Sequence, residues 1–257
     1  MACQRCVKQV VMAMLFLCFV AACGTRSTSP VKIGQHAYST GRGRSRVNYL
    51  LFLPQDYGQE PEKQWPLILF LHGRGKRGDS RKELELLKRD GPPMLVEGQP
   101  DFSFIVLSPQ CPSDSSWESQ LDKLDALVDE IVESYAVDTR RIYLTGLSMG
   151  GLGTWHFALE HPARFAAVVP IAGGYIFESD EIPDNICDVA DVPIWVFHGT
   201  RDDVVLPRQS KVMVDALQAC PGNVRFTLYP GADHDDAWKL AYSDPELYEW
   251  LLAQTLK

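Results

Sequence analysis

Residues 141–151, Arg-Ile-Tyr-Leu-Thr-Gly-Leu-Ser-Met-Gly-Gly, decide the fold of this chain. Their first five residues are mostly β-branched, aromatic or apolar, which is typical of a buried strand. Beyond Gly151, apolar residues recur at helical spacing until Pro162: Leu152, Trp155 and Leu159. The pattern predicts that Ser148 lies on a sharp turn between a strand and a helix, where Gly146 and Gly150 let the backbone bend tightly.

The pentapeptide Gly-Leu-Ser-Met-Gly at 146–150 is a weak signal by itself. A G-x-S-x-G sequence occurs by chance in about one chain of this size in ten. The alternative interpretation is a glycine-rich turn that carries an ordinary serine. The flanking strand and helix, and partners for Ser148 elsewhere in the chain, must therefore decide between the two.

The rest of the chain repeats the alternation of strand and helix. Strand patterns occupy 66–71, 104–107, 141–145, 166–171, 193–197 and 224–229. The runs 66–71 and 104–107 are continuously apolar, which is typical of strands covered on both faces. Helical patterns lie between them, for example at 116–135, and a final helix ends near Leu252. This order predicts an α/β fold with an open, mostly parallel sheet and helices on both faces. We expect one domain over 32–257, with the strand 47–53 near a sheet edge.

Composition narrows the class of function. The 257 residues carry a net charge of −8 and are 46% apolar, enough to fill a core. No basic stripe is present, so a nucleic-acid partner is not expected.

The first residues form a separate segment. Arg5 and Lys8 precede an apolar run at 10–22, which is shorter than a membrane span and ends in small residues. This pattern predicts a signal peptide over 1–22. Val20-Ala21-Ala22-Cys23 also resembles a bacterial lipoprotein signal, with Cys23 lipidated and 24–31 as a linker. We expect an exported protein held at a membrane of the cell envelope only by this anchor; the alternative is ordinary cleavage, giving a periplasmic or secreted protein.

Three of the seven cysteines lie in the predicted domain: Cys111, Cys187 and Cys220. An exported protein favours one disulfide among them, with one thiol left over. The three pairings stay open. No two of these cysteines have the spacing of metal ligands, so no metal site is expected.

Three polar residues follow predicted strands in an order that carries chemistry. In open α/β sheets ligands bind beyond the carboxyl ends of the strands, where Ser148, Asp202 and His234 are expected to meet. A serine hydroxyl needs a base to activate it and a carboxylate to orient that base. The order Ser, acid, His is that of the α/β-hydrolases. Asp203 is the alternative acid and is otherwise a turn residue.

The remaining histidines fit the role of base less well. His36 precedes the first expected strand, and His156 and His161 lie on the helix after Ser148. His72 and His198 precede glycines and are interpreted as turn residues. His234, in a loop after the last strand, is the predicted base.

An acyl-transfer serine also needs donors aimed at the developing oxyanion. The backbone amides of Met149 and of Arg74, in the glycine-rich turn at 72–75, are the predicted donors. Trp117, Tyr175 and Trp238 are candidate pocket residues, and the connection 173–192 is the loop with room to cover the site. No cofactor is expected for this chemistry.

Four motifs together resemble a known group: His72-Gly73-Arg74-Gly75-Lys76-Arg77-Gly78, Ser108-Pro109-Gln110-Cys111-Pro112, 145–151 and His198-Gly199-Thr200-Arg201-Asp202. They are similar to bacterial α/β-hydrolases of the phospholipase/carboxylesterase and dienelactone-hydrolase type, including polyhydroxybutyrate-depolymerase-like and feruloyl-esterase-like enzymes. The resemblance covers roughly residues 32–256. It implies Ser148 as nucleophile, Asp202 and His234 as its partners, and the Arg74 and Met149 amides as oxyanion hole. The charged Arg74 departs from the small or apolar residue that such enzymes often have there.

The resulting hypothesis is hydrolysis of short or soluble carboxylic esters, a small-molecule substrate, through an acyl-enzyme. One alternative is a serine peptidase of the prolyl-oligopeptidase-like type, which has the same triad on the same fold. The other is a tethered, hydrolase-like binding protein without catalysis. Assaying a peptide beside its ester analogue distinguishes a peptidase from an esterase. Labelling of Ser148 by a fluorophosphonate probe distinguishes an enzyme from a binding protein.

Overall fold

A computed structural model describes residues 31–256. Within the part of the chain that the structure describes, the residues from Lys32 onward form one compact unit. The predicted signal peptide, Cys23 and nearly all of the predicted linker lie outside the described residues. None of the helices in 31–256 has the length and apolarity needed to cross a bilayer.

The described unit is built on an eight-stranded sheet with the order β1-β2-β4-β3-β5-β6-β7-β8. The strands are β1 (Gly34–Thr40), β2 (Val47–Leu53), β3 (Trp65–Leu71), β4 (Ile105–Pro109), β5 (Val137–Leu147), β6 (Ala167–Ile171), β7 (Ile194–Gly199) and β8 (Val224–Tyr229). β2 is antiparallel to both β1 and β4, and the pairs from β4 to β8 are parallel. The carboxyl ends of β3 to β8 therefore meet at one edge of the sheet.

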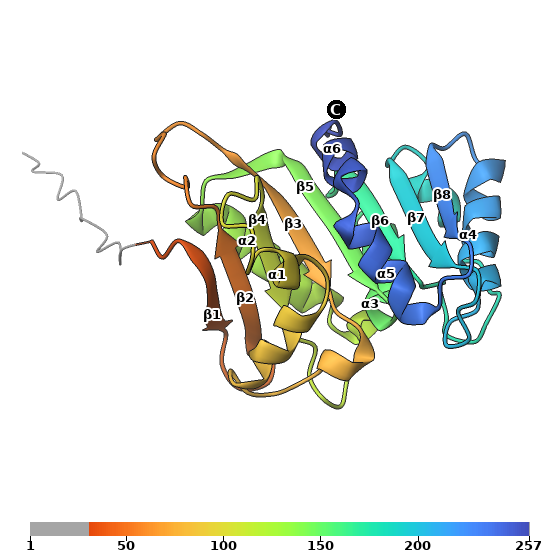
Figure 1. The fold of residues 1–257 in the computed structure, drawn as a ribbon, viewed down its shortest axis with the longest axis horizontal. Helices are drawn as coiled ribbons and strands as arrows, with labels where there is room; N and C mark the ends of the chain where they lie inside the picture. The colour runs from red at the N-terminus through yellow and green to blue at the C-terminus, as the bar shows by residue number, and fades with distance from the viewer. Residues whose placement is uncertain (1–30, 257) are drawn as a thin grey trace, which may run out of the picture. The chain divides into compact units, whose positions relative to one another are not determined.

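Among the described residues, four helices lie between parallel strands and two follow the last strand (Figure 1). They are α1 (Gly91–Leu95), α2 (Leu121–Ser134), α3 (Met149–Glu160), α4 (Pro207–Ala219), α5 (His234–Ser243) and α6 (Pro245–Leu252). Five short 3₁₀ segments are also described: η1 (Gly43–Ser45), η2 (Arg74–Lys76), η3 (Glu83–Arg89), η4 (Trp117–Ser119) and η5 (Ile186–Val189).

The sheet is covered on both faces because alternate side chains of its central strands point to opposite sides. In β3, Leu67 and Leu69 belong to a core cluster that includes residues of α2, α3 and α4. Ile68 and Phe70 of the same strand belong to a second cluster, with residues of α5 and α6. This explains why β3 is a continuous apolar run, and the predicted α/β fold with a mostly parallel sheet is confirmed.

β2 lies near the edge of the sheet, as expected, with β1 outside it. β1 itself was not expected, because its sequence, GQHAYST, is too polar to reveal a strand and is only partly buried. One expectation about the helices was wrong. The single final helix is two helices, α5 and α6. They are separated at Asp244, whose carboxylate caps α6 by accepting from the Glu246 amide at 2.9 Å, and Pro245 begins the new helix.

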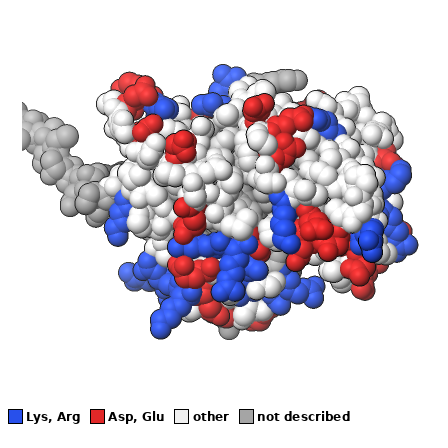
Figure 2. Space-filling view, in the orientation of Figure 1, with Lys and Arg blue, Asp and Glu red and all other residues white. Residues whose placement is uncertain are grey.

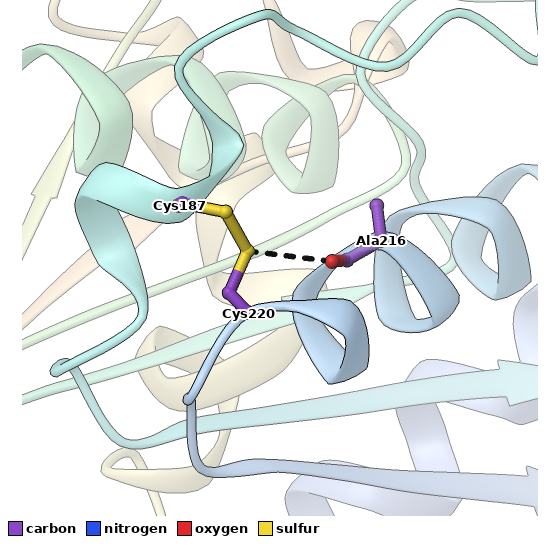
Figure 3. The surroundings of a disulfide bond; sticks show 3 residues. All are labelled: Cys187, Ala216 and Cys220. Atoms are coloured by element: carbon purple, nitrogen blue, oxygen red, sulfur yellow. Dashed lines mark hydrogen bonds between the residues drawn. A yellow bond between two sulfur atoms is a disulfide. The ribbon is translucent and has the colours of Figure 1, made fainter.

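Of the three pairings left open, the structure contains the disulfide Cys187–Cys220, with a Cα–Cα distance of 5.6 Å (Figure 3). It joins η5, beyond the loop 173–183, to the residue that directly follows α4. Cys111 is buried and is the free thiol among the described residues.

Charged side chains of both signs mix over the face seen in Figure 2. Lys and Arg gather with Asp and Glu among them around the segment that contains η3 and α1. Several of these form exposed or half-exposed pairs, such as Lys88 with Glu85 at 3.2 Å. The face therefore has no uniformly basic stripe.

Candidate active site

Ser148 lies in a one-residue turn between β5 and α3. Its backbone has φ 55° and ψ −120°, a conformation that residues other than glycine rarely adopt. The Ser148 amide donates to the Ile171 carbonyl at 3.0 Å, and the Leu152 amide donates to the Ser148 carbonyl at 3.0 Å. The serine is thus fixed at the carboxyl edge of the sheet, as the pattern of 141–151 predicts.

The glycines on either side of Ser148 are required by close backbone contacts. A Cβ on Gly150 would lie 1.9 Å from the Leu71 carbonyl oxygen, and one on Gly146 would lie 2.4 Å from the Gly150 oxygen. Both distances are far shorter than a van der Waals contact. Helix α3 can therefore begin directly against β3 only because these positions lack side chains.

Asp202 and His234 lie together at the same edge of the sheet. His234 Nδ1 donates to Asp202 Oδ2 at 2.7 Å. The Asp202 side chain is fully buried, whereas that of His234 is 14% exposed. Asp203, the alternative acid, is exposed. Of the two candidate carboxylates, the structure brings Asp202 to His234.

His234 is the first residue of α5, and backbone contacts join the loop that carries Asp202 to the loop that leads into this helix. The Thr200 amide donates to the Tyr229 carbonyl at 3.0 Å, and the Arg201 amide donates to the Ala232 carbonyl at 2.9 Å. The Gly231 amide donates to Thr200 Oγ1 at 2.8 Å. The loop after β7 is therefore hydrogen-bonded to the loop after β8, and these bonds keep Asp202 beside His234.

Asp202 accepts three hydrogen bonds and has a fourth polar contact, with His198. The amides of Val204 and Val205 donate to its Oδ1 at 3.0 and 2.9 Å. His198 Nε2 lies 3.1 Å from its Oδ2, the atom that also accepts from His234. Burial raises the pKa of Asp202, but the hydrogen bonds from His198, His234 and Val205 outweigh burial and hold its pKa below the usual range. The carboxyl is therefore ionised at neutral pH.

His198, predicted from its sequence context to be a turn residue, contacts the side chain of Asp202. It is fully buried at the end of β7, four positions before Asp202. Its position before Gly199 in a motif with Asp202 is the signal that could have found it.

The other histidines lie away from this pair. His36 is in β1 and contacts the Ile33 carbonyl, and His161 lies 3.8 Å from Asp125. His156 lies nearer Ser148: it lines the cavity described below, stacks on Tyr175 and contacts the Tyr175 carbonyl at 2.9 Å.

His72 connects two of the motifs. The Cys111 amide donates to its Nε2 at 3.0 Å, so the Nδ1 proton must point to the Gly73 carbonyl, 2.8 Å away. The Trp117 indole donates to the His72 carbonyl at 2.9 Å. Gln110 Nε2 donates to the Lys76 carbonyl at 3.0 Å, and the Gly78 amide to the Cys111 carbonyl at 3.0 Å. The segment 108–112 therefore supports the turn 72–78.

The two predicted oxyanion donors begin helices beside Ser148. Arg74 is the first residue of η2 and Met149 the first of α3, so neither amide has an acceptor within its own helix. A Cβ built on Gly73 would lie 3.6 Å from Ser148 Cβ, which places this turn against the serine. Arg74 and Met149 both line the same cavity as Ser148.

A cavity of about 530 Å³ opens at Ser148. Its wall combines apolar residues with two guanidinium groups, one carboxylate and serine hydroxyls. It includes Arg74, Arg77, Ser115, Ser116, Glu118, Met149, Leu152, His156, Tyr175, Ile176, Phe177 and Val204. Arg74 lies over the Phe177 ring, with its guanidinium carbon 5.5 Å from the ring centroid. The loop 173–177 thus forms one side of the cavity.

Of the three aromatic residues predicted to line the pocket, only Tyr175 does so. Trp117 is 1% exposed and packs in the core, with its indole bonded to His72. Trp238 lines a separate cavity of about 680 Å³ between α1 and α5. Trp117 is a core residue because the absence of a side chain at Gly153 admits its ring against α3.

Within the described residues, Ser148 and His234 make no hydrogen bond to each other, and Nε2 of His234 is not used in any other bond. In structures without substrate, such bonds are often long and tighten only when substrate binds. No group of three or more His, Cys, Asp and Glu side chains in 31–256 is arranged to hold a metal ion.

Comparison with known proteins points to the same family as the motifs. The family model of phospholipases and carboxylesterases matches residues 102–239. The bifunctional acetylxylan esterase/xylanase XynS20E of Neocallimastix patriciarum is 28% identical over 192 residues, 72% of this chain and 26% of that protein. The dipeptidyl-peptidase 5 of Porphyromonas gingivalis is 25% identical over 245 residues, 80% of this chain and 35% of that protein. The chain therefore spans about a third or less of the length of these two relatives.

Solved structures agree. A thermostable esterase superposes with a TM-score of 0.71 and 32% identity over 86% of this chain and 63% of that one. The feruloyl esterase module of Clostridium thermocellum shares the fold, with a TM-score of 0.65, 17% identity and coverage of 87% and 89%. The match of the family model to more than half of the chain, with this fold, confirms the resemblance: the chain belongs to the phospholipase/carboxylesterase family.

Proposed function

We propose that this protein hydrolyses carboxylic esters through an acyl-enzyme, with Ser148 as nucleophile, His234 as base and Asp202 as the orienting acid. The observation that carries the proposal is the 2.7 Å contact of His234 Nδ1 with a buried Asp202, at the sheet edge that also carries Ser148 in its strained turn. A base oriented by a carboxylate, with a partly exposed serine at the same edge of the sheet, is the arrangement that acyl transfer needs.

In the proposed reaction, Ser148 Oγ attacks the ester carbonyl carbon while His234 Nε2 takes the hydroxyl proton. The ionised Asp202 stabilises the imidazolium that forms. The amides of Arg74 and Met149 donate to the oxyanion of the tetrahedral intermediate. Collapse breaks the bond to the alcohol, which leaves with the proton from His234. Water, activated by His234, then attacks the acyl-enzyme and releases the acid and Ser148.

We expect short or soluble acyl esters as substrates. The cavity at Ser148 is about 530 Å³ and is bounded by Ile176 and Phe177 of the loop after β6, which suits a compact acyl group. The acetylxylan esterase/xylanase relative favours a small acyl group as well. Initial rates on acetyl, butyryl and long-chain esters of one alcohol test this; a preference for long-chain emulsions would contradict it.

Peptide hydrolysis is the second candidate, because the relative from Porphyromonas gingivalis is a dipeptidyl-peptidase. A peptide and its ester analogue, assayed side by side, separate the two activities. Turnover of the peptide at a rate comparable to the ester would make peptidase the better assignment.

The decisive test of the proposed function is Ser148→Ala. Loss of the nucleophile should lower kcat on a short p-nitrophenyl ester by roughly 10⁴-fold or more and abolish labelling by a fluorophosphonate. Ser116, which lines the same cavity, provides the matched control, and Ser116→Ala should keep activity and labelling. Full activity of Ser148→Ala would refute the mechanism, and an unlabelled wild type would favour a binding protein.

We also propose that 1–22 is a signal peptide and that Cys23 carries a lipid anchor, on the pattern of the sequence alone. Cys23→Ser should move the protein from the membrane to the soluble fraction of the cell envelope. Unchanged fractionation would leave ordinary signal cleavage, or no export, as the interpretation.

A further inference from the structure

His198 occupies a buried position between the Asp202 carboxylate and helix α4. Its side chain has no exposed surface. Nε2 lies 2.8 Å from the Val205 carbonyl and 3.1 Å from Asp202 Oδ2. On the other side of the ring, Nδ1 lies 2.7 Å from Ser210 Oγ in α4. A buried imidazole with defined partners at both nitrogens is held in one orientation.

The partners of Nε2 determine which atom holds a proton. A backbone carbonyl can only accept, and an ionised carboxylate can only accept. Nε2 of His198 must therefore carry a hydrogen, which is shared between Val205 O and Asp202 Oδ2. This holds whether or not Nδ1 is also protonated, because the Ser210 hydroxyl can serve Nδ1 either as donor or as acceptor.

Both oxygens of the Asp202 carboxylate therefore have polar partners. Two backbone amides hold Oδ1, and the two histidines reach Oδ2. In the described residues, the ionisable side chains in hydrogen-bond contact with Asp202 are His198 from β7 and His234 from α5. Helix α4 contributes the neutral Ser210, which contacts the Gly173 carbonyl at 2.9 Å.

We propose that His198 is a positioning residue for the reaction proposed above: its Nε2–H fixes Asp202 and moderates how strongly that carboxylate attracts the proton of His234. The inference rests on the proposed function for its effect on rate, but not for the hydrogen bond itself.

The physical effect of the Nε2–H donor has two parts. It removes a degree of freedom from the carboxylate that orients His234, and misplacement of catalytic groups by about 1 Å can cost 10²-fold in rate. It also stabilises the negative charge of Asp202. Without this donor, Asp202 Oδ2 becomes more basic and holds the His234 imidazolium more strongly, so the base is blocked by a proton at a higher pH.

A pair of conservative variants tests the proposal, because each amide replaces one ring nitrogen. In His198→Gln the side-chain NH₂ reaches the position of Nε2, whereas in His198→Asn it reaches only that of Nδ1. We expect His198→Asn to lower kcat on a short ester roughly ten- to hundred-fold, with KM little changed. Its acid limb of kcat/KM should move to higher pH by on the order of one unit. His198→Gln should restore the wild-type limb and most of the rate.

Ser210→Ala is the matched control, because it removes the partner of Nδ1 and leaves the Nε2 contacts in place. Its acid limb should stay at the wild-type pH. If His198→Asn lowers kcat without moving the limb, or if the Gln and Asn variants behave alike, His198 is only a packing residue and the proposal fails.

An NMR measurement covers the case in which the His198 variants do not fold. In a sample labelled with ¹⁵N at histidine, the Nε2 signal of His198 should show an attached proton at neutral pH, and this signal should shift in Asp202→Asn. An unprotonated Nε2, or a signal indifferent to Asp202→Asn, would overturn the proposal. The NMR readout does not depend on ester turnover, so it separates failure of this inference from failure of the proposed function, which Ser148→Ala tests.

Discussion

His72 shows how one buried side chain makes stability depend on pH. Burial, reinforced by the nearby cations Lys76 and Arg77, lowers the pKa of His72 from 6.5 to about 4, although its bond to the Gly73 carbonyl acts in the opposite sense. The neutral ring is needed because Nε2 accepts from the Cys111 amide. A proton on that nitrogen would set two donors against each other.

The prediction from His72 is loss of stability in acid. Above pH 6.5 the ring is neutral in both folded and unfolded chains, so it adds no pH dependence. As the pH falls from 6.5 toward 4, the unfolded chain binds a proton that the folded state excludes, and this costs roughly 3 kcal/mol. Urea unfolding of the wild type and His72→Gln at pH 7.5 and 4.5 measures it. The wild type should lose more stability than the variant; equal losses would assign the acid sensitivity to other groups.

At the scale of single residues, the sequence predicts which side chains lie at the strand ends better than it predicts what surrounds them. Ser148, Asp202 and His234 follow from strand ends, because topology alone brings those ends together. The choice of Asp202 over Asp203 needed the loop conformation. The roles of His72 and His198, and the burial of Trp117, depend on contacts between segments about 40 residues apart or on ring orientation, which no local pattern encodes.

The junction of β5 and α3 sets the position of Ser148. The start of α3 is held by the close contact of Gly150 with the carbonyl of Leu71, the last residue of β3. This junction was predictable because small residues at fixed spacing have a local signature. The edge strand β1 was not, because its half-covered, polar sequence has no such signature.

Gly150→Ala should therefore disturb the site more than its size suggests. The added methyl would lie 1.9 Å from the Leu71 oxygen, so α3 must shift away from β3, at a cost of about 1–3 kcal/mol or more. The shift moves Ser148 and the Met149 amide together, and we expect at least a 10²-fold loss of kcat/KM.

Gly75→Ala is the control for that variant. It lies in the neighbouring turn, and a Cβ there meets nothing within 4 Å. Ester turnover and the midpoint of thermal unfolding should both stay near the wild type. If Gly150→Ala also stays near the wild type, the close contact of α3 with β3 is not what positions the serine.

Across the whole domain, the layered architecture was predictable from buried strands that alternate with helices. Successive side chains of a strand such as β3 point to opposite faces of the sheet, so the core divides into two clusters, one on each face. The pairing of cysteines was not, since spacing alone allows any of three choices. The Cys187–Cys220 bridge depends on η5 lying beside the end of α4, an arrangement fixed by long-range packing. It leaves Cys111 as the free thiol of the described residues.

Cys111 gives the domain a built-in reporter. Its side chain is fully buried, and burial raises the pKa of its thiol to about 12, so a thiol reagent should find no reactive sulfur in the closed protein. In a protein that consists of residues 32–257, Cys111 should react with the reagent more slowly than an exposed thiol. The ratio of the two rates equals the equilibrium constant for opening, so labelling slows tenfold for each 1.4 kcal/mol or so in the free energy of opening. Rapid labelling in native buffer would contradict this. If labelling is slow, the rate at which Cys111 reacts with the reagent measures how often the core beneath the 72–78 turn opens.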